Sequence, residues 1–500
     1  MKHYFYPALV LLAGLVTAQI LFSIFVYFSN ISLYQTLEAI RHSGYVIVPN
    51  EWVMPSLKTI TPAICGGLFF SLTTGVGLTL MTFLMVCVWR RYSNHYGLLL
   101  FLFLAGTIFL TIKFNYNILL TLVCILIIGA TIFAALKFQP DSREHGYPLF
   151  RVFAGHFFVI VLIGLVWMPV INKDIFVSIR DNLLLSNPIG EQINNFYYKY
   201  TLYPAETFKS LDQKLLKSCH INTHDKNQFE QIKQKMIAHD YLPVNKKFTP
   251  DLTIDTEKNM LIFLRHGEKI HQCSFVEFLK SSPKILESIS EKTDHHKFLR
   301  KLTFFSMITA SPLICYFFLH AFFLLGLFFV KSKMLRMAGA STACLMMFTL
   351  PAISFYHQPV DAQDREGLSK NLSAEIWQDR VAALKVISDH TDHNIRMDRY
   401  IEPDQLDRLI QSPMIADRYW LAKALGNSQT TASYLLILKL LDDPHPNVVC
   451  MAMHSLGKQN HRKTRVAINE ILRRIKISEH WYVQWYAYKA LKRLGWKQEK

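Results

Sequence analysis

The chain has 500 residues, of which 51% are hydrophobic and only 18% are charged. This composition is typical of a membrane protein that carries soluble parts. A net charge of +17 is compatible with a nucleic-acid ligand. However, residues 172–300 contain 19 basic and 16 acidic residues, and residues 357–500 contain 22 basic and 17 acidic residues. Both regions are only mildly basic and neither has a zinc-finger spacing, so nucleic-acid binding is excluded and the remaining charge is expected to contact anionic lipid.

Uncharged or nearly uncharged runs long enough to cross a bilayer recur along the chain. The first continues through Phe28, which is too long for a signal peptide cleaved after Ala18, so an uncleaved anchor is expected. Gly67, Ser71 and Gly75 have the spacing of small residues at close helix contacts. Seven spans are predicted, at about 5–28, 61–89, 96–112, 117–136, 152–171, 303–330 and 337–356.

The orientation of the spans follows from the basic residues in their short connecting loops. Seven spans place three basic residues on one side, namely Arg41, Lys58 and Lys113. They place nine on the other, namely Lys2, Arg90, Arg91, Lys137, Arg143, Arg151, Lys331, Lys333 and Arg336. The sequence therefore predicts a multi-pass protein of a bacterial inner membrane, with a cytoplasmic N-terminus and both soluble domains outside the cytoplasm.

The insert between the fifth and sixth spans is long enough for a small α+β core. Helices are expected near 205–218, 226–238 and 275–290, and a strand, a turn and a strand between 261 and 275. The turn reads Arg265-His266-Gly267-Glu268, which looks like the motif of histidine phosphatases, but the 35 residues that follow cannot hold the rest of that fold. Gly267 is instead expected to supply a positive φ in a hairpin turn.

Two cysteines and two histidines are the candidate site residues of the insert and the bundle. Cys219 and Cys273 share a small domain on the oxidising side, so they are predicted to form a disulfide. His156 and His320 lie within predicted spans, where polar side chains are costly and tend to face the bundle interior. They could ligate a b-type haem, relay protons or bond neighbouring backbone. The pairs His220/His224, His295/His296 and His390/His393 have ligand-like spacing, but no matching Cys or carboxylate cluster accompanies them, so no metal is predicted; no cofactor is predicted either.

A degenerate repeat begins near residue 371. Its copies are marked by Ala383-Leu384, Ala424-Leu425, Ser455-Leu456 and Ala490-Leu491, spaced by 41, 31 and 35 residues. This spacing suits a two-helix solenoid unit, and Asp443-Pro444 suits the turn inside one.

Residues 371–496 resemble HEAT-type repeats, with Asp443-Pro444 and Val448 at the turn and core positions of that family. The chain departs from the family at Val449, where arginine is usual, and in a very aromatic last unit. The resemblance implies a protein-binding scaffold and no reaction. The aromatic residues of the last unit are Trp481, Tyr482, Trp485 and Tyr486. They are expected to lie in the core or to form a terminal cap. The alternative is that they form a partner-binding surface.

The expected fold class is mainly α, a polytopic helical membrane protein with an extracytoplasmic α+β insert and a C-terminal HEAT-like α-solenoid. The expected domains are a membrane bundle at 1–171, the insert at 172–302, two further spans at 303–356 and the repeat domain at 357–500. Two functions remain open. The first is a non-catalytic inner-membrane scaffold or assembly subunit that binds a protein partner through its repeats. The alternative is a transporter or membrane-enzyme subunit that uses the bundle.

Overall fold

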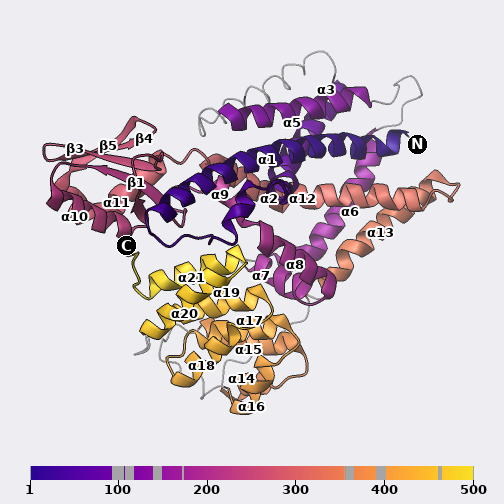
Figure 1. Cartoon of the computed structure of the whole chain (residues 1–500). Coiled ribbons are helices and arrows are strands. Elements are labelled where there is room, and N and C mark those ends of the chain that lie inside the picture. The colour runs from indigo at the N-terminus through magenta and orange to yellow at the C-terminus, as the bar shows by residue number, and fades with distance from the viewer. Residues whose placement is uncertain are drawn as a thin grey trace.

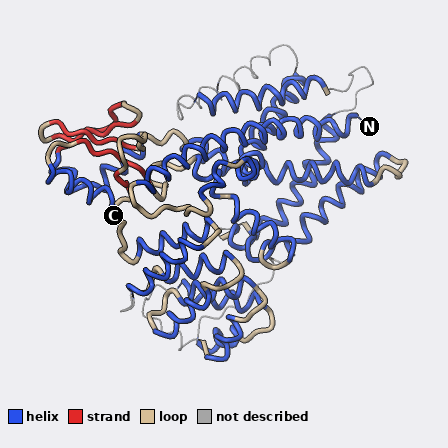
Figure 2. The backbone as a smooth tube through the Cα atoms, in the orientation of Figure 1, coloured by secondary structure: helices blue, strands red, loops and turns tan. Residues whose placement is uncertain are grey.

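The computed structural model describes residues 2–92, 106, 118–138, 149–171, 174–353, 355, 365–389, 401–459 and 464–498. Within these residues the chain is mainly helical (Figures 1 and 2). Long apolar helices form a bundle, a five-stranded sheet lies beside one end of it, and paired helices form a separate stack. Figure 1 shows α7 and α8 between the bundle and this stack.

Among the described residues, five helices are long and apolar enough to cross a membrane, in agreement with a multi-pass protein. They belong to α1 (Lys2–His42), α2 with α3 (Ile60–Phe70 and Val76–Tyr92), α5 (Ile118–Lys137), α12 (Lys297–Gly326) and α13 (Lys333–Ile353). A sixth candidate comprises α6 (Leu149–Trp167) and the segment Ile175–Leu184, which meet at an angle of 100°. Apart from Gly106, the predicted span at 96–112 lies outside the described residues.

Helix α1 is longer than the span predicted for it. Beyond Phe28 it continues for about four turns to His42, because apolar residues recur there at helical spacing. Leu37 and Ile40 lie on that face and are buried. The extension brings α1 against α9 and β1 of the insert. A loop with a short 3₁₀ helix at Met54–Lys58 then leads to α2.

The small residues of the second span allow the close helix contact that their spacing predicted. A Cβ on Gly67 would lie 2.8 Å from the Ser23 backbone, and one on Gly75 would lie 2.7 Å from the Ala18 Cβ. Between α2 and α3 the helix widens into a π-helical turn at Ser71–Gly75. Helix α1 therefore packs directly against the backbone of this span.

The insert begins with short helical segments and continues into the sheet. The helices are α7 (Ile175–Ile179), the π-helical η4 (Arg180–Leu184), α8 (Pro188–Tyr200), α9 (Leu202–Thr207), α10 (Lys226–Ala238) and α11 (Phe275–Lys292). The strands are β1 (Lys217–Asn222), β2 (Tyr241–Pro243), β3 (Leu252–Glu257), β4 (Met260–Arg265) and β5 (Glu268–Ser274), in the spatial order β2-β1-β3-β4-β5. Strand β1 is parallel to β2 and β3, and the other pairings are antiparallel.

The second half of the insert follows the sequence-based expectation and its beginning does not. Strands β4 and β5 form the predicted hairpin, and their turn has φ +50° at His266 and +84° at Gly267. The helix predicted over 205–218 is wrong: α9 ends at Thr207, and β1 begins at Lys217. Residues 208–216 form an irregular segment with a turn, in which Leu211 and Leu216 are buried.

The C-terminal stack contains four pairs of helices. They are α14 and α15 (Arg365–Leu372, Trp377–Asp389), α16 and α17 (Pro403–Ile410, Ile415–Leu425), α18 and α19 (Thr431–Leu440, Pro446–Leu456), and α20 and α21 (Thr464–Ile477, Trp481–Arg493). The second helix of each pair packs against the second helix of the next. A Cβ on Gly426 or Gly457 would collide with Ser455 or Ala490, so these glycines permit the close packing.

Charged side chains join consecutive pairs of the stack. Arg380 donates to the buried Asp417 carboxylate from Nε at 2.9 Å and from Nη2 at 2.6 Å. Arg418 donates to both carboxylate oxygens of Asp443, from Nε to Oδ2 at 2.6 Å and from Nη2 to Oδ1 at 3.3 Å. Such bidentate pairs add directional contacts to the apolar packing between helices. One hydrophobic core runs from the bundle through α9 into the stack, whereas the sheet has a core of its own.

Candidate functional site

The four aromatic residues singled out in the last repeat face this chain's own insert. Trp481 is buried against the Tyr203 ring, with centroids 4.9 Å apart, and Tyr482 packs on Tyr198 at 4.5 Å. Trp485 and Tyr486 are half-buried and pack with Tyr482. Burial raises the pKa of the Tyr482 phenol, so it is neutral at ordinary pH. These rings therefore form an internal interface, which agrees with the core interpretation.

Asp181 lies at the centre of the contact between η4 and the stack. Only 1% of it is exposed, and its Oδ2 accepts a hydrogen bond from Trp420 Nε1 at 2.9 Å. Lys385 of α15 approaches the same oxygen at 3.3 Å, and Arg180 donates to Oδ1 at 2.7 Å. The Arg180 guanidinium also lies 3.8 Å from the centroid of the Tyr419 ring. We call Arg180, Asp181, Lys385, Tyr419 and Trp420 the Asp181 cluster.

Two asparagines extend this interface towards the end of the stack. Asn194 of α8 and Asn447 of α19 are both buried and exchange hydrogen bonds of 2.8 and 3.2 Å. Asn50, in the loop after α1, donates from its amide to the carbonyls of Ile475, Lys476 and Ser478 at 2.8 to 3.0 Å. Its backbone N–H donates to Gln484 Oε1 at 2.7 Å. Each of these buried amides finds its partner only when the stack is docked.

Further contacts hold the last helix to the insert and to the first loop. Tyr488 donates to Asp240 Oδ1 at 2.7 Å, and Lys492 forms an ion pair with Asp240 at 3.0 Å. Gln498 pairs with the backbone of Val46, accepting from its N–H and donating to its carbonyl. The face of the stack formed by its second helices is therefore covered by segments of the same chain. The loop after α1, the insert and the stack consequently lie on one side of the bundle.

The two histidines predicted to face the bundle interior lie against each other. Their ring centroids are 4.5 Å apart at an interplanar angle of 84°. His156 Nδ1 is 2.9 Å from the Tyr316 hydroxyl, and His320 Nε2 is 3.3 Å from Ser341 Oγ. These side chains come from α6, α12 and α13 and form a polar group among apolar helices, which we call the histidine cluster.

The histidine cluster as it stands does not fit a haem. A metal ion between two imidazoles needs about 2 Å to each nitrogen, which would hold the ring centroids well beyond 4.5 Å. The described residues also contain no group of three His, Cys, Asp or Glu side chains suited to a metal ion. Of the roles left open by the sequence, hydrogen bonding of the two histidines fits this geometry. Their partners are side chains and not backbone groups. A role in proton transfer stays a hypothesis.

The predicted disulfide between Cys219 and Cys273 is wrong. Cys219 is in β1 and Cys273 in β5, and strands β3 and β4 lie between them. Three strand spacings separate the two backbones by about 14 Å, whereas bonded cysteines need Cα atoms within about 7 Å of each other. Both are buried free thiols in the core of the sheet. Their shared domain was correctly inferred, but strand order was not available from their positions in the chain.

Comparison with known proteins gives no relationship from which a role could be carried over. No protein-family model, curated protein or solved structure matches this chain.

Sequence reasoning missed the residues that make the internal interface. Asp181, Asn194 and Asn50 are single polar residues in loops or short helices, and each is buried by a partner more than 200 residues away. The one available signal was the density of aromatic residues in 196–203. Tyr198 and Tyr203 of that segment contact the last repeat.

Proposed function

We propose that the protein is a non-catalytic membrane scaffold or accessory subunit that binds a protein partner through its C-terminal helix pairs, which we interpret as HEAT-like repeats. The observation that carries this proposal is the asymmetry of the stack. Its inner face is bound to the chain's own insert through the Asp181 cluster, so the stack is held in one orientation relative to the bundle. A fixed orientation suits a scaffold, because it presents the opposite face at a constant position.

The outer face offers the binding surface in this proposal. Leu435 of α18 and Val466 and Ile477 of α20 each expose more than half of their area. These side chains lie on the first helices of the last two pairs, and we take them as the contact surface for a protein partner. The aromatic residues Trp481, Tyr482, Trp485 and Tyr486 then stabilise the orientation of the stack, and the partner contacts the outer helices.

We further propose a bacterial inner-membrane location with the insert and the stack outside the cytoplasm. The distribution of short-loop basic residues supports this orientation, and contacts among the first loop, the insert and the stack require one common side. Reporter fusions after residues 290 and 500 are expected to be active outside the cytoplasm, and a fusion after Arg336 inside it. A cytoplasmic signal from the C-terminal fusion contradicts the orientation.

Photo-crosslinking tests the partner proposal. A photoreactive residue at Leu435 or Val466 is expected to produce a crosslinked product that contains a second protein. The same residue at Tyr482 is expected to crosslink within the chain, because it faces Tyr198. Intermolecular products at Tyr482 together with none at the outer positions would contradict the proposal.

The histidine cluster supports one alternative, in which the bundle belongs to a transporter or membrane enzyme and the stack docks or regulates it. A buried polar group inside apolar helices is a functional hypothesis by default. Single substitutions His156→Phe and His320→Phe separate the two functions. The scaffold proposal expects unchanged crosslinking at Leu435 and a normal cellular phenotype. The alternative expects unchanged crosslinking with loss of the phenotype.

A further inference from the structure

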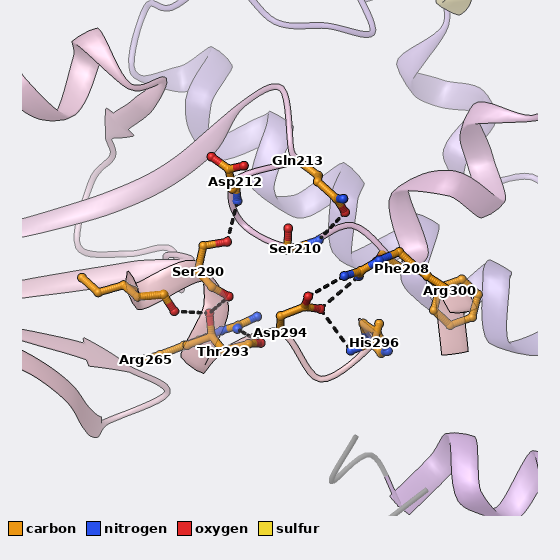
Figure 3. Close-up of polar contacts among 11 residues, drawn as sticks. Phe208, Ser210, Asp212, Gln213, Arg265, Ser290, Thr293, Asp294, His296 and Arg300 are labelled. Carbon is orange, nitrogen blue, oxygen red and sulfur yellow. Dashed lines mark hydrogen bonds and ion pairs between the residues drawn. The ribbon is translucent and has the colours of Figure 1, made fainter. Parts of the chain in front are cut away.

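A polar cavity of about 130 Å³ lies where α1, the segment after α9 and the junction of α11 with α12 meet (Figure 3). A single water needs only about 10–15 Å³ of such space, so this cavity can hold a group of the size of a phosphate. Its walls come from parts of the chain that are far apart in sequence, and β4 adds Arg265 at one edge. None of its residues belongs to the histidine cluster or to the Asp181 cluster.

Hydroxyl groups dominate one wall of the cavity. Ser29 and Ser32 project from α1, and Ser210 from the segment after α9. Within the part of the chain that the structure describes, none of these three hydroxyls makes a hydrogen bond. Each can therefore donate to a ligand oxygen without breaking an existing bond.

One of the cations that line the cavity has no carboxylate partner among the described residues. Lys209 pairs with Glu206, Lys214 pairs with Asp251 at 2.8 Å, and Arg300 pairs with Asp294. Arg265 donates from Nη1 to the Thr293 carbonyl at 3.0 Å and has no carboxylate partner among the described residues. Its remaining N–H groups can bind an oxyanion. Of the described cations that line the cavity, Arg265 is thus the one that is free to bind an anion.

His296 adds a second unsatisfied group to the opposite wall. Its ring packs edge-on against Phe208, and its Nδ1 is buried without a hydrogen-bond partner among the described residues. Burial lowers the pKa of His296 to about 4, so the ring is neutral at ordinary pH. A neutral imidazole can donate one hydrogen bond from the tautomer that a ligand selects.

The height of the cavity along the bundle indicates the source of such an anion. The apolar run of α1 ends at Phe28, and Ser29 and Ser32 occupy the next turn. On the other side, His296 immediately precedes Lys297, where the membrane-length helix α12 begins. The cavity thus lies level with the end of the continuous apolar run of α1 and with the start of α12, where we place the phosphate groups of a bilayer.

We propose that this cavity binds the singly charged phosphodiester of an anionic, hydroxylated phospholipid headgroup of the phosphatidylglycerol type. Arg265 binds the phosphate oxygens, and the serine hydroxyls of α1 and Ser210 bind the remaining oxygens. The proposal rests on the membrane location and does not depend on partner binding by the stack. The same chemistry occurs in a soluble glycerophosphodiester, which the experiment distinguishes from the lipid.

The test uses the full-length protein in a neutral detergent, with phosphatidylglycerol or phosphatidylcholine added to the micelles. Bound lipid is measured by native mass spectrometry and stabilisation by tryptophan fluorescence during heating. Phosphatidylglycerol is expected to bind at least tenfold more tightly than phosphatidylcholine. Arg265→Gln removes the cation and is expected to weaken binding about tenfold, through loss of a charge-assisted hydrogen bond. Ser210→Asp places a repelling charge in the cavity and is expected to have a similar effect.

The control is Arg473→Gln, because Arg473 is an exposed arginine of α20 far along the chain from the cavity and paired only with Glu470. It is expected to bind lipid as the unmodified protein does. If Arg265→Gln lowers the yield of folded protein, Ser210→Asp still decides the question. Equal binding of the two lipids, or unchanged binding by the folded cavity variants, overturns the proposal. Equally tight binding of glycerophosphoglycerol, which lacks acyl chains, overturns the lipid source and leaves a soluble phosphodiester.

Discussion

Replacing Asp181 by asparagine perturbs the contact on which the orientation of the stack depends. The substitution keeps the shape of the side chain and removes the negative charge that Arg180 and Lys385 surround. Two of the four polar contacts of Asp181 reach the stack, those from Trp420 and Lys385. Hydrogen bonds to charged groups contribute about 1.5–3 kcal/mol each, with the lower values for partly exposed partners such as Lys385. Undocking should become easier by about 3 kcal/mol, or roughly a hundredfold in its equilibrium constant.

Hydrogen exchange of the detergent-solubilised protein measures this effect. The amides of α15 and α17 are expected to exchange faster in Asp181→Asn, and the amides of the sheet should not change, because the sheet has its own core. Asp389→Asn is the matched control, since Asp389 is 73% exposed and its ion pair with Lys423 should contribute less than about 1 kcal/mol. Equal exchange in α15 and α17 for both variants would refute the role assigned to Asp181.

Three further predictions concern other parts of the structure. Asn50→Ala removes the amide that binds three carbonyls at the C-terminal end of α20, so the opening free energy of the amides near Ser478 should fall by about 2–3 kcal/mol and their exchange should be faster. Unchanged exchange there would show that the loop does not hold the stack. Burial lowers the pKa of His296 from 6.5 to about 4, so the unfolded chain binds the extra proton between these values. Stability should therefore fall by up to about 3 kcal/mol as the pH falls from about 6.5 to 4. The variant His296→Gln keeps the charged and titratable groups around this ring, which are Asp294, His295, Arg265 and Arg300. Thermal unfolding of the variant should depend less on pH. A slope identical to that of the unmodified protein would contradict the assignment. Cys219 and Cys273 should resist alkylation until the protein unfolds, because burial raises the pKa of both thiols, to about 11 for Cys273. A disulfide-linked peptide containing both cysteines would contradict the strand order.

Local features of the fold could be predicted because each depends on residues close in sequence. Apolar runs identified the long helices, and the hairpin turn at Gly267 followed from one glycine between two short strands. His156 and His320 were expected to face the bundle interior, since hydrocarbon offers them no partner. Their proximity, 4.5 Å between ring centroids, required the packing of α6 on α12 and could not be inferred from either segment alone.

Features that depend on distant pairing could not be predicted. The order of the strands separates Cys219 from Cys273, although a small domain made their bond reasonable. The cavity near Arg265 is built from four segments of the chain, none of which has a recognisable binding motif. The interface of the stack follows the same rule, because Asp181 has a partner 239 residues away in Trp420. Polar residues that are buried by remote partners have no periodic signal in the sequence.

The most direct test of the docked orientation is a crosslink between Asn194 and Asn447. These side chains exchange hydrogen bonds across the interface between α8 and α19. Cysteines at both positions, in a chain whose native cysteines have been replaced, should form a disulfide when native membranes are treated with a mild oxidant, because the two side chains are in direct contact. A pair at Asn194 and Leu435 should remain unjoined, because Leu435 lies on the exposed side of α18. A crosslink at 194–447 with none at 194–435 is the predicted result. Crosslinking of the control pair, or of neither pair in folded protein, would contradict the docked orientation.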